Sequence, residues 1–333
     1  MILRPPLLRQ PPMIVTSAGP AASAAAVPGW LRAAAAGPGS LEDAAFAAAA
    51  ALTALDAVVR RQQRWAGAWR QRLALGCAAV TVRQAGRVED ESALRDAVLL
   101  TRPGDDVGPA GRMLLAWRRL AGSPAEKLLT EASVAAVLDD LGFAQDGEAV
   151  SDLAADLRLL TAIEGVVGML TGALQSVERR RLGWALGAWV ADASLALRLG
   201  WQHAVPLLGA EPAWGANAAR RGRPATGVAP GVESESERTK NLLAAQARAV
   251  LRAIDLSAEL GRRADRLLAV APQLRAKAAD LVVERLLSDD AIVASEKIAG
   301  MSDRGLRRLF DRLVELGAVR ELSGRPTFRI YGL

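Results

Sequence analysis

The chain has 333 residues, of which 51% are apolar and only 4% aromatic. A chain of this length can bury a large core, and abundant alanine with few aromatic residues favours packed helices over β-sheets. One cysteine and one histidine exclude an internal disulfide, paired-cysteine metal sites and most histidine-based catalytic sites. We therefore expect an all-α, cytoplasmic protein that is not an enzyme and uses no metal or other cofactor.

The net charge of +6 lies entirely in the final third of the sequence. Residues 238–333 hold 18 basic and 12 acidic side chains, whereas residues 1–237 hold 24 of each. A basic segment beside a neutral one is typical of proteins that bind nucleic acid through that segment.

Residues 1–29 are rich in proline and alanine without hydrophobic periodicity, which predicts a disordered tail. Residues 30–200 show helical spacing and predict an α-helical domain. Its first long helix is predicted at Leu41–Arg61, with Ser40 as the N-cap residue. Further helices are predicted at Arg64–Ala85, Glu89–Leu100, Pro109–Leu120, Pro124–Leu141, Ala149–Leu160, Thr161–Val177 and Leu182–Gly200.

The last two of these segments are apolar enough to raise the question of a membrane hairpin. Their apolar content is mostly alanine and glycine, and they carry Glu164, Asp192 and Arg198. We expect buried helices of a bundle and no membrane partner.

Cys77 and His203 are the natural candidates for reactive side chains. Cys77 lies in the apolar stripe of its helix, which predicts a small buried side chain rather than a nucleophile. His203 has no catalytic partner nearby in sequence, so we expect a packing or surface role.

The least helical stretch of the N-terminal domain is residues 101–112. Its Asp105 and Asp106, flanked by Arg102 and Arg112, form a loop of possible function that could hold a divalent cation or a phosphate. The alternative, which we favour, is that one aspartate caps the next helix and the other pairs with an arginine. An enzyme that uses this loop remains a minor hypothesis.

Proline, glycine and charged clusters predict a linker or loop at residues 201–236. Residues 237–271 then predict one long helix that either connects two domains or forms a homodimer seam. Its apolar spacing is not a sustained heptad, so no coiled coil is predicted.

Residues 272–333 show the element order of a winged helix-turn-helix. The predicted elements are a helix at Leu274–Leu287, a short helix from Asp290 to Ala299, a third helix at Asp303–Leu316 capped by Ser302, and a two-stranded β-wing at Ala318–Leu322 and Thr327–Tyr331. The predicted fold is thus a multi-helix N-terminal bundle with a C-terminal winged helix-turn-helix.

The third helix of this segment separates leucines from arginines. Leu306, Leu309, Phe310 and Leu313 recur at helical spacing and must face the core, which turns the arginines outward. Arginines on such a helix suit guanine edges and phosphates, and arginines of the wing suit the DNA backbone. The candidate DNA-binding residues are Arg304, Arg307, Arg308, Arg312, Arg325 and Arg329.

Three stretches, residues 69–75, 102–112 and 313–329, resemble a bacterial family catalogued as domain of unknown function 1403. The similarity runs from about Trp30 to the C-terminus. It implies no activity, cofactor or catalytic residue.

Two hypotheses follow. The first is a DNA-binding protein, regulatory or associated with plasmid or mobile DNA, in which a homodimer is possible. The second is an interaction scaffold whose winged helix docks another protein, because Asp303, Asp311 and Glu315 dilute the basic face.

Overall fold

The computed structural model describes residues 27–144, 146–211, 234–325 and 327–333. It is predominantly helical, with a small antiparallel sheet near the C-terminus, so the helical fold class is confirmed. The predicted disordered tail, apart from residues 27–29, and residues 212–233 of the predicted linker lie outside the described residues.

Most of the helices precede a single long one. In chain order they are α1 (Gly29–Ala36), α2 (Leu41–Arg60), α3 (Ala66–Gln84), α4 (Glu91–Leu99), α5 (Gly108–Gly122), α6 (Ala125–Leu128), α7 (Glu131–Asp140), α8 (Gly147–Ile163), α9 (Val166–Arg179), α10 (Gly183–Arg198) and the 3-10 turn η1 (Leu208–Ala210). We call residues 27–211 the body.

The long helix α12 (Glu235–Val270) leads into what we call the C-terminal module, residues 271–333. The module contains η2 (Ala271–Gln273), α13 (Ala279–Ser288), β1 (Ile292–Val293), α14 (Asp303–Glu315), β2 (Arg320–Glu321) and β3 (Ile330–Gly332).

Helix starts follow the capping residues that the sequence indicates. The Ser40 hydroxyl accepts the Asp43 N–H at 3.1 Å, while the Asp43 carboxylate accepts the Ser40 N–H at 3.3 Å, which completes a capping box. Ser302 accepts the Gly305 N–H at 3.2 Å and begins α14 where predicted.

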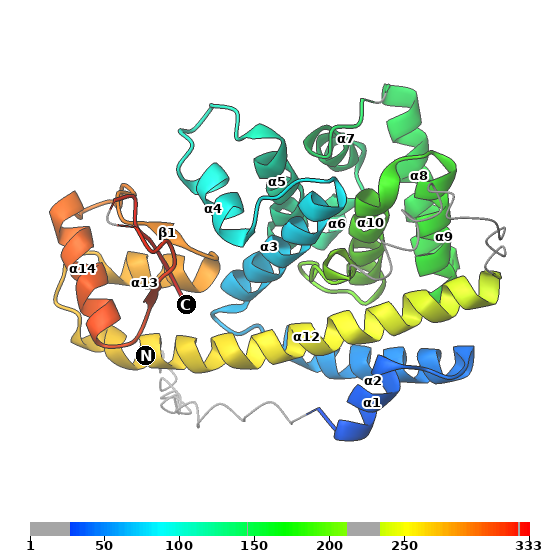
Figure 1. The fold of residues 1–333 in the computed structure, drawn as a ribbon, viewed down its shortest axis with the longest axis horizontal. Coiled ribbons are helices and arrows are strands. Elements are labelled where there is room, and N and C mark those ends of the chain that lie inside the picture. The colour runs from blue at the N-terminus through cyan, green and yellow to red at the C-terminus, as the bar shows by residue number, and fades with distance from the viewer. Residues whose placement is uncertain (1–26, 145, 212–233, 326) are drawn as a thin grey trace, which may run out of the picture.

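Helix α12 runs along the length of the molecule, with α1 and α2 on one side, the other helices of the body on the opposite side, and the module at its carboxyl end (Figure 1). Its apolar side chains, among them Leu243, Val250 and Leu260, are buried against the body, and α2 packs along it. This burial satisfies the apolar side of α12 within one chain, so that side is not available as a dimer seam. One continuous cluster of buried apolar side chains extends from Leu31 in α1 to Leu333.

Residues 201–211, which the composition assigned to a linker, pack into the core instead. Val205, Leu207 and Leu208 are at most 1% exposed. The Asp192 carboxylate of α10 accepts the N–H of Leu207 at 2.7 Å and that of Leu208 at 3.1 Å, and thereby anchors the segment. Burial raises the pKa of Asp192 well above its usual value, against the effect of these two hydrogen bonds.

The module differs from the predicted winged helix in two respects. The predicted second helix is wrong, because residues 292–293 form a strand and residues 294–302 are irregular. The two predicted wing strands are present as the antiparallel pair β2 and β3, and the unpredicted strand β1 pairs with the other side of β3 to give a three-stranded sheet of order β1-β3-β2. Ile292 pairs with Tyr331, and Glu321 pairs with Tyr331 from the other side.

The reason is local: Ala291–Ala294 is an apolar run with two β-branched residues, and all four are buried. A strand hides this run more completely than an exposed helical turn could.

Within the described ranges, no helix is long and apolar enough to cross a membrane. The segments that raised that question form α9 and α10, whose inward-facing residues are buried against neighbouring helices.

Cys77 and His203 lie in the kinds of environment that the sequence predicts. Cys77 is fully buried, and burial raises the pKa of its thiol well above the usual value. His203 is half-buried in a β-bridge with Pro124, and burial lowers its pKa.

Candidate nucleic-acid interface

The position of the C-terminal module is fixed by a buried carboxylate. Asp290 is 1% exposed, and its two oxygens are bound by Arg72 of α3 and Arg95 of α4, the latter at 2.6 Å. Burial raises the pKa of Asp290, but the two guanidinium groups outweigh that effect and bring it below the usual value. The sequence pattern had placed Asp290 at the start of a short helix, whereas the structure makes it the ionic anchor of the module.

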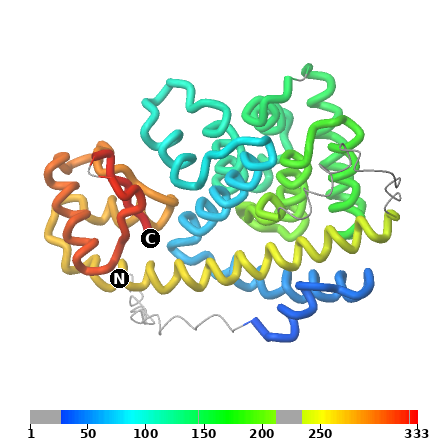
Figure 2. The backbone as a smooth tube through the Cα atoms, in the orientation of Figure 1, coloured from blue at the N-terminus to red at the C-terminus, as the bar shows by residue number. Residues whose placement is uncertain are grey.

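Main-chain contacts extend this anchor. Arg72 also donates to the carbonyl oxygens of Asp290 and Leu333, each at 3.3 Å, and Arg263 of α12 donates to that of Leu333 at 3.2 Å. The carboxyl end of the chain thus lies where the module meets α3 and α12 (Figure 2).

A close backbone approach adds to the anchor. A Cβ atom on Gly67 of α3 would lie 2.6 Å from the carbonyl oxygen of Ser288, so α3 and α13 can pack this closely only with glycine at that position. The module therefore has one defined orientation on the body.

The hairpin tip is also held by the body. Arg325 is half-buried, and its guanidinium pairs with the carboxylate of Asp96 in α4. The side chain of Arg325, a predicted wing contact to DNA, is thus turned toward the body and paired there with a carboxylate.

The opposite side of the module carries exposed arginines. Leu306, Leu309, Phe310 and Leu313 of α14 are buried as the periodicity predicts, and Phe310 stacks on Tyr331 of β3 with ring centroids 4.3 Å apart. As a result α14 lies on the side of the module away from the body (Figure 1).

Arg304, Arg307 and Arg308 are exposed on this outer side. Among the residues that the structure describes, none of the three has an acidic partner within 4.0 Å. Together with Arg329 they form what we call the α14 basic face.

The two remaining candidate arginines are only loosely paired. Arg312 pairs with Glu315 at 3.1 Å on the exposed surface of α14. Arg329 lies 3.9 Å from Asp311, and its pKa is raised chiefly by hydrogen bonding with the Tyr331 side chain. Exposed pairs of this kind are worth little, so a polyanion can compete for both guanidinium groups.

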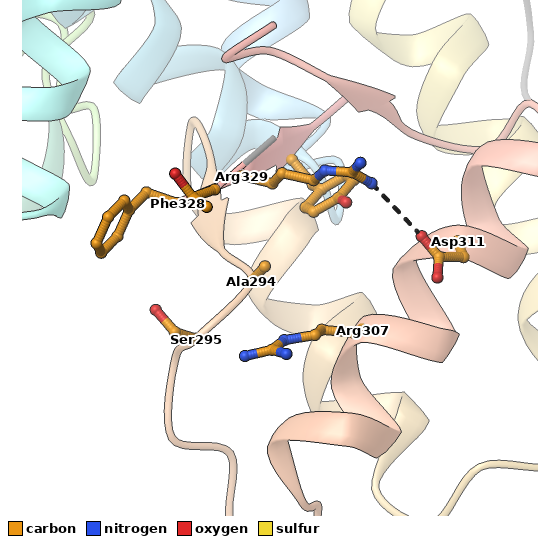
Figure 3. A pocket seen from close by; sticks show the side chains of 8 residues that line it. Ala294, Ser295, Arg307, Asp311, Phe328 and Arg329 are labelled. Carbon is orange, nitrogen blue, oxygen red and sulfur yellow. Dashed lines mark ion pairs between the residues drawn. The ribbon is translucent and has the colours of Figure 1, made fainter. Parts of the chain in front are cut away.

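A shallow hollow of about 390 Å³ separates α14 from the sheet. Arg307 projects from α14 toward Ser295 across this hollow, while Phe328 and Arg329 border its other side (Figure 3). The lining of the hollow combines two guanidinium groups with one carboxylate, three hydroxyl groups and an exposed aromatic ring. Its formal charge of +1 suits a phosphodiester or an acidic peptide better than an uncharged ligand.

Sequence patterns did not identify two residues of this surface, Phe328 and Lys277. Phe328 is 66% exposed and has a φ of 52°, which is unusual for a bulky residue. Lys277 reaches the turn before α14, since a Cβ on Gly300 would lie 3.8 Å from its Cε. The positive φ of Phe328 has no sequence signal, and Lys277 becomes a neighbour only through the loop before α13.

In the loop of residues 101–112, Asp106 alone makes the two contacts that we had expected from two different aspartates. Asp106 accepts the N–H of Gly108 at 3.0 Å and lies 3.6 Å from Arg112, so it stabilises the start of α5. Arg102 and Asp105 are exposed, and among the described residues neither forms an ion pair with Asp106 or Arg112. The described residues contain no group of His, Cys, Asp and Glu suited to a metal ion, either in this loop or elsewhere.

The architecture defines a predominantly helical protein with an arginine-bearing C-terminal module. A family model described as "Protein of unknown function (DUF1403)" matches residues 17–333, so the chain belongs to this family. Neither a curated protein nor a solved structure matches the chain.

Proposed function

We propose that this protein binds double-stranded DNA without catalysing a reaction, and that the α14 basic face contacts the duplex. The observation that carries the proposal is the set of three exposed guanidinium groups, Arg304, Arg307 and Arg308, on the outward side of a capped helix. Within the described chain they have no carboxylate partner, whereas other arginines of the same module do.

The geometry supports contact by a helix rather than by the hairpin tip. We interpret the order α13, β1, α14, β2, β3 as a winged-helix variant in which an irregular segment replaces the second helix. Helix α14 would enter the major groove, with Arg329 beside it across the hollow and Lys277 at the turn before its amino end to meet phosphates. We leave Arg325 out of this surface, because its guanidinium is paired with Asp96 on the side of the module that faces the body.

Salt dependence of binding tests the proposal on the full chain. The anisotropy of a labelled duplex of about 25 base pairs would be titrated at several salt concentrations between 50 and 200 mM. Each phosphate contact contributes about 0.9 to the slope of log K against log salt, so replacing Arg304, Arg307 and Arg308 by alanine should lower the slope by up to about 2.7.

The matched control replaces Arg83, Arg102 and Arg179 by alanine. These exposed arginines of the body form no ion pair with the acidic residues that the structure describes, and their loss removes the same formal charge. If the control variant loses affinity and salt slope as much as the α14 variant, net charge rather than a defined face explains binding, and the proposal fails.

A second candidate function is protein docking through the same surface. Phe328 favours it, because a largely exposed phenylalanine beside the hollow is a typical anchor for a partner protein. Under this alternative, Phe328→Ser abolishes capture of the partner, capture survives nuclease treatment, and the arginine variant changes it little.

A further inference from the structure

The outward face of α2 carries a second exposed surface, far along the molecule from α14 (Figure 1). Phe46 of α2 is 65% exposed and Trp30 of α1 is 53% exposed, and their ring centroids are 5.8 Å apart. Large aromatic side chains are scarce in this sequence, and an exposed pair of them costs solvation free energy unless another surface covers it.

The exposed residues of α2 follow one line along the helix. Apart from Asp43 of the first turn, they recur at intervals of three and four residues and are Glu42, Phe46, Ala49, Thr53, Ala57 and Arg60. Between the two charged ends this line holds only apolar or small side chains, and the Thr53 hydroxyl is satisfied by the Ala49 carbonyl at 2.9 Å. A helix could therefore pack closely against it.

The charges at the two ends are of opposite sign. Glu42 is exposed at the amino end, and Arg60 and Arg61 are exposed at the carboxyl end. In the described chain, no ion pair involves Glu42 or Arg61, while Arg60 pairs within its own helix with Asp56 at 2.7 Å.

We propose that this face is the interface of a homodimer, in which α2 of one chain packs antiparallel against α2 of a second copy. A two-fold axis between Ala49 and Thr53 places Glu42 of each chain beside Arg60 and Arg61 of the other, so the face is complementary to itself in charge. The same axis places the large Phe46 ring opposite the small Ala57 side chain, which also makes it complementary in shape. The interface does not use α12, whose apolar side is buried in the body.

The first experiment measures the mass of the full chain in solution by light scattering, from about 1 to 200 µM. The expected result is a dimer that dissociates on dilution, and Phe46→Asp should raise its dissociation constant at least tenfold. A monomer at every concentration, or a dimer that Phe46→Asp leaves unchanged, overturns the proposal.

Charge-reversal variants distinguish a weakened interface from a folding defect, because only a weakened interface can be rescued by a second reversal. Glu42→Arg alone and Arg61→Glu alone should each weaken the dimer, because each places like charges opposite one another. The double variant should restore most of the affinity, since it re-forms the pair with its signs exchanged. Two weakened single variants without rescue in the double variant contradict the antiparallel arrangement.

Cross-linking tests the position of the two-fold axis. Ala49→Cys places two thiols about 6 Å apart along the helix direction, with the helix axes about 8–10 Å apart, within reach of a short bismaleimide. The natural Cys77 is fully buried and does not compete. The control Val88→Cys, at a residue that is 93% exposed on the body, should give no cross-linked dimer. Equal cross-linking of both variants would overturn the proposed axis.

Discussion

On the side of the C-terminal module that faces the body, Arg72 and Arg95 surround the buried carboxylate of Asp290. On the opposite side, Arg304, Arg307 and Arg308 point to solvent. The first set is neutralised and holds the module in place, whereas the second set is available to a ligand. The comparison teaches that the arginine content of a segment says little about its function until the partner of each guanidinium is known.

The largest loss of stability should come from removing the buried carboxylate that holds the module on the body. Asp290→Ala leaves the guanidinium groups of Arg72 and Arg95 without their carboxylate in a largely buried site, which typically costs about 3–5 kcal/mol. Urea unfolding of the full chain measures the loss.

The matched control is Asp289→Ala. Asp289 is only partly buried and pairs with Arg285 at 2.8 Å on the surface, so its loss should cost less than about 1 kcal/mol. Equal losses at the two positions would show that Asp290 does not anchor the module.

Acid should weaken the same anchor. Because the pKa of Asp290 is lowered in the folded state, its contribution is complete above the unfolded-state pKa of about 4 and is lost as pH falls toward the lower folded value. Stability measured from pH 7 to pH 2 should therefore fall less steeply below pH 4 in Asp290→Asn than in the unmodified chain. Parallel curves would contradict this assignment.

A steric change should weaken the anchor to a smaller extent. Gly67→Ala places a Cβ against the backbone of Ser288, which cannot yield without moving α13, and overpacking of this kind costs about 1–3 kcal/mol. The control Gly76→Ala lies on the same helix, where a Cβ meets no atom within 4 Å. If α3 and α13 pack this closely, Gly67→Ala should lower the unfolding midpoint more than Gly76→Ala does.

The hairpin tip should contribute less. Arg325→Ala removes a partly exposed ion pair with Asp96 and should cost about 0.2–1 kcal/mol. It should also leave DNA affinity nearly unchanged, in contrast to Arg304→Ala. A large loss of affinity in Arg325→Ala would show that the tip leaves α4 to contact DNA.

The smallest effect on stability is expected for the α14 basic face. The variant with Arg304, Arg307 and Arg308 replaced by alanine should unfold within about 0.5 kcal/mol of the unmodified chain at each position, because none of the three forms an ion pair in the described structure. A much larger destabilisation would mean that these arginines serve the fold.

Local sequence signals predicted most of the helices. The positions of α2 and α14 follow from Ser40, Ser302 and the apolar spacing, because a cap and a helical face are properties of neighbouring residues. The outward orientation of the α14 arginines follows from the same spacing.

What the sequence did not predict depends on residues far apart in the chain. Asp290 and Arg95 are 195 residues apart, and Arg325 and Asp96 are 229 apart, so no local pattern pairs them. The burial of Val205 and Leu207 likewise depends on Asp192 of α10, which outweighs the turn-forming composition of that segment.

The length of helix α12 amplifies any change in its direction. Its 36 residues form a rod about 54 Å long that is continuous between the body and the module. A tilt of about 5° at its amino end would displace its carboxyl end by about 5 Å, comparable with the rise of one helical turn. Because ion pairs tie the module to α3 and α4, such a tilt could occur only if they broke, so they hold the arginines of α14 in one register relative to the body.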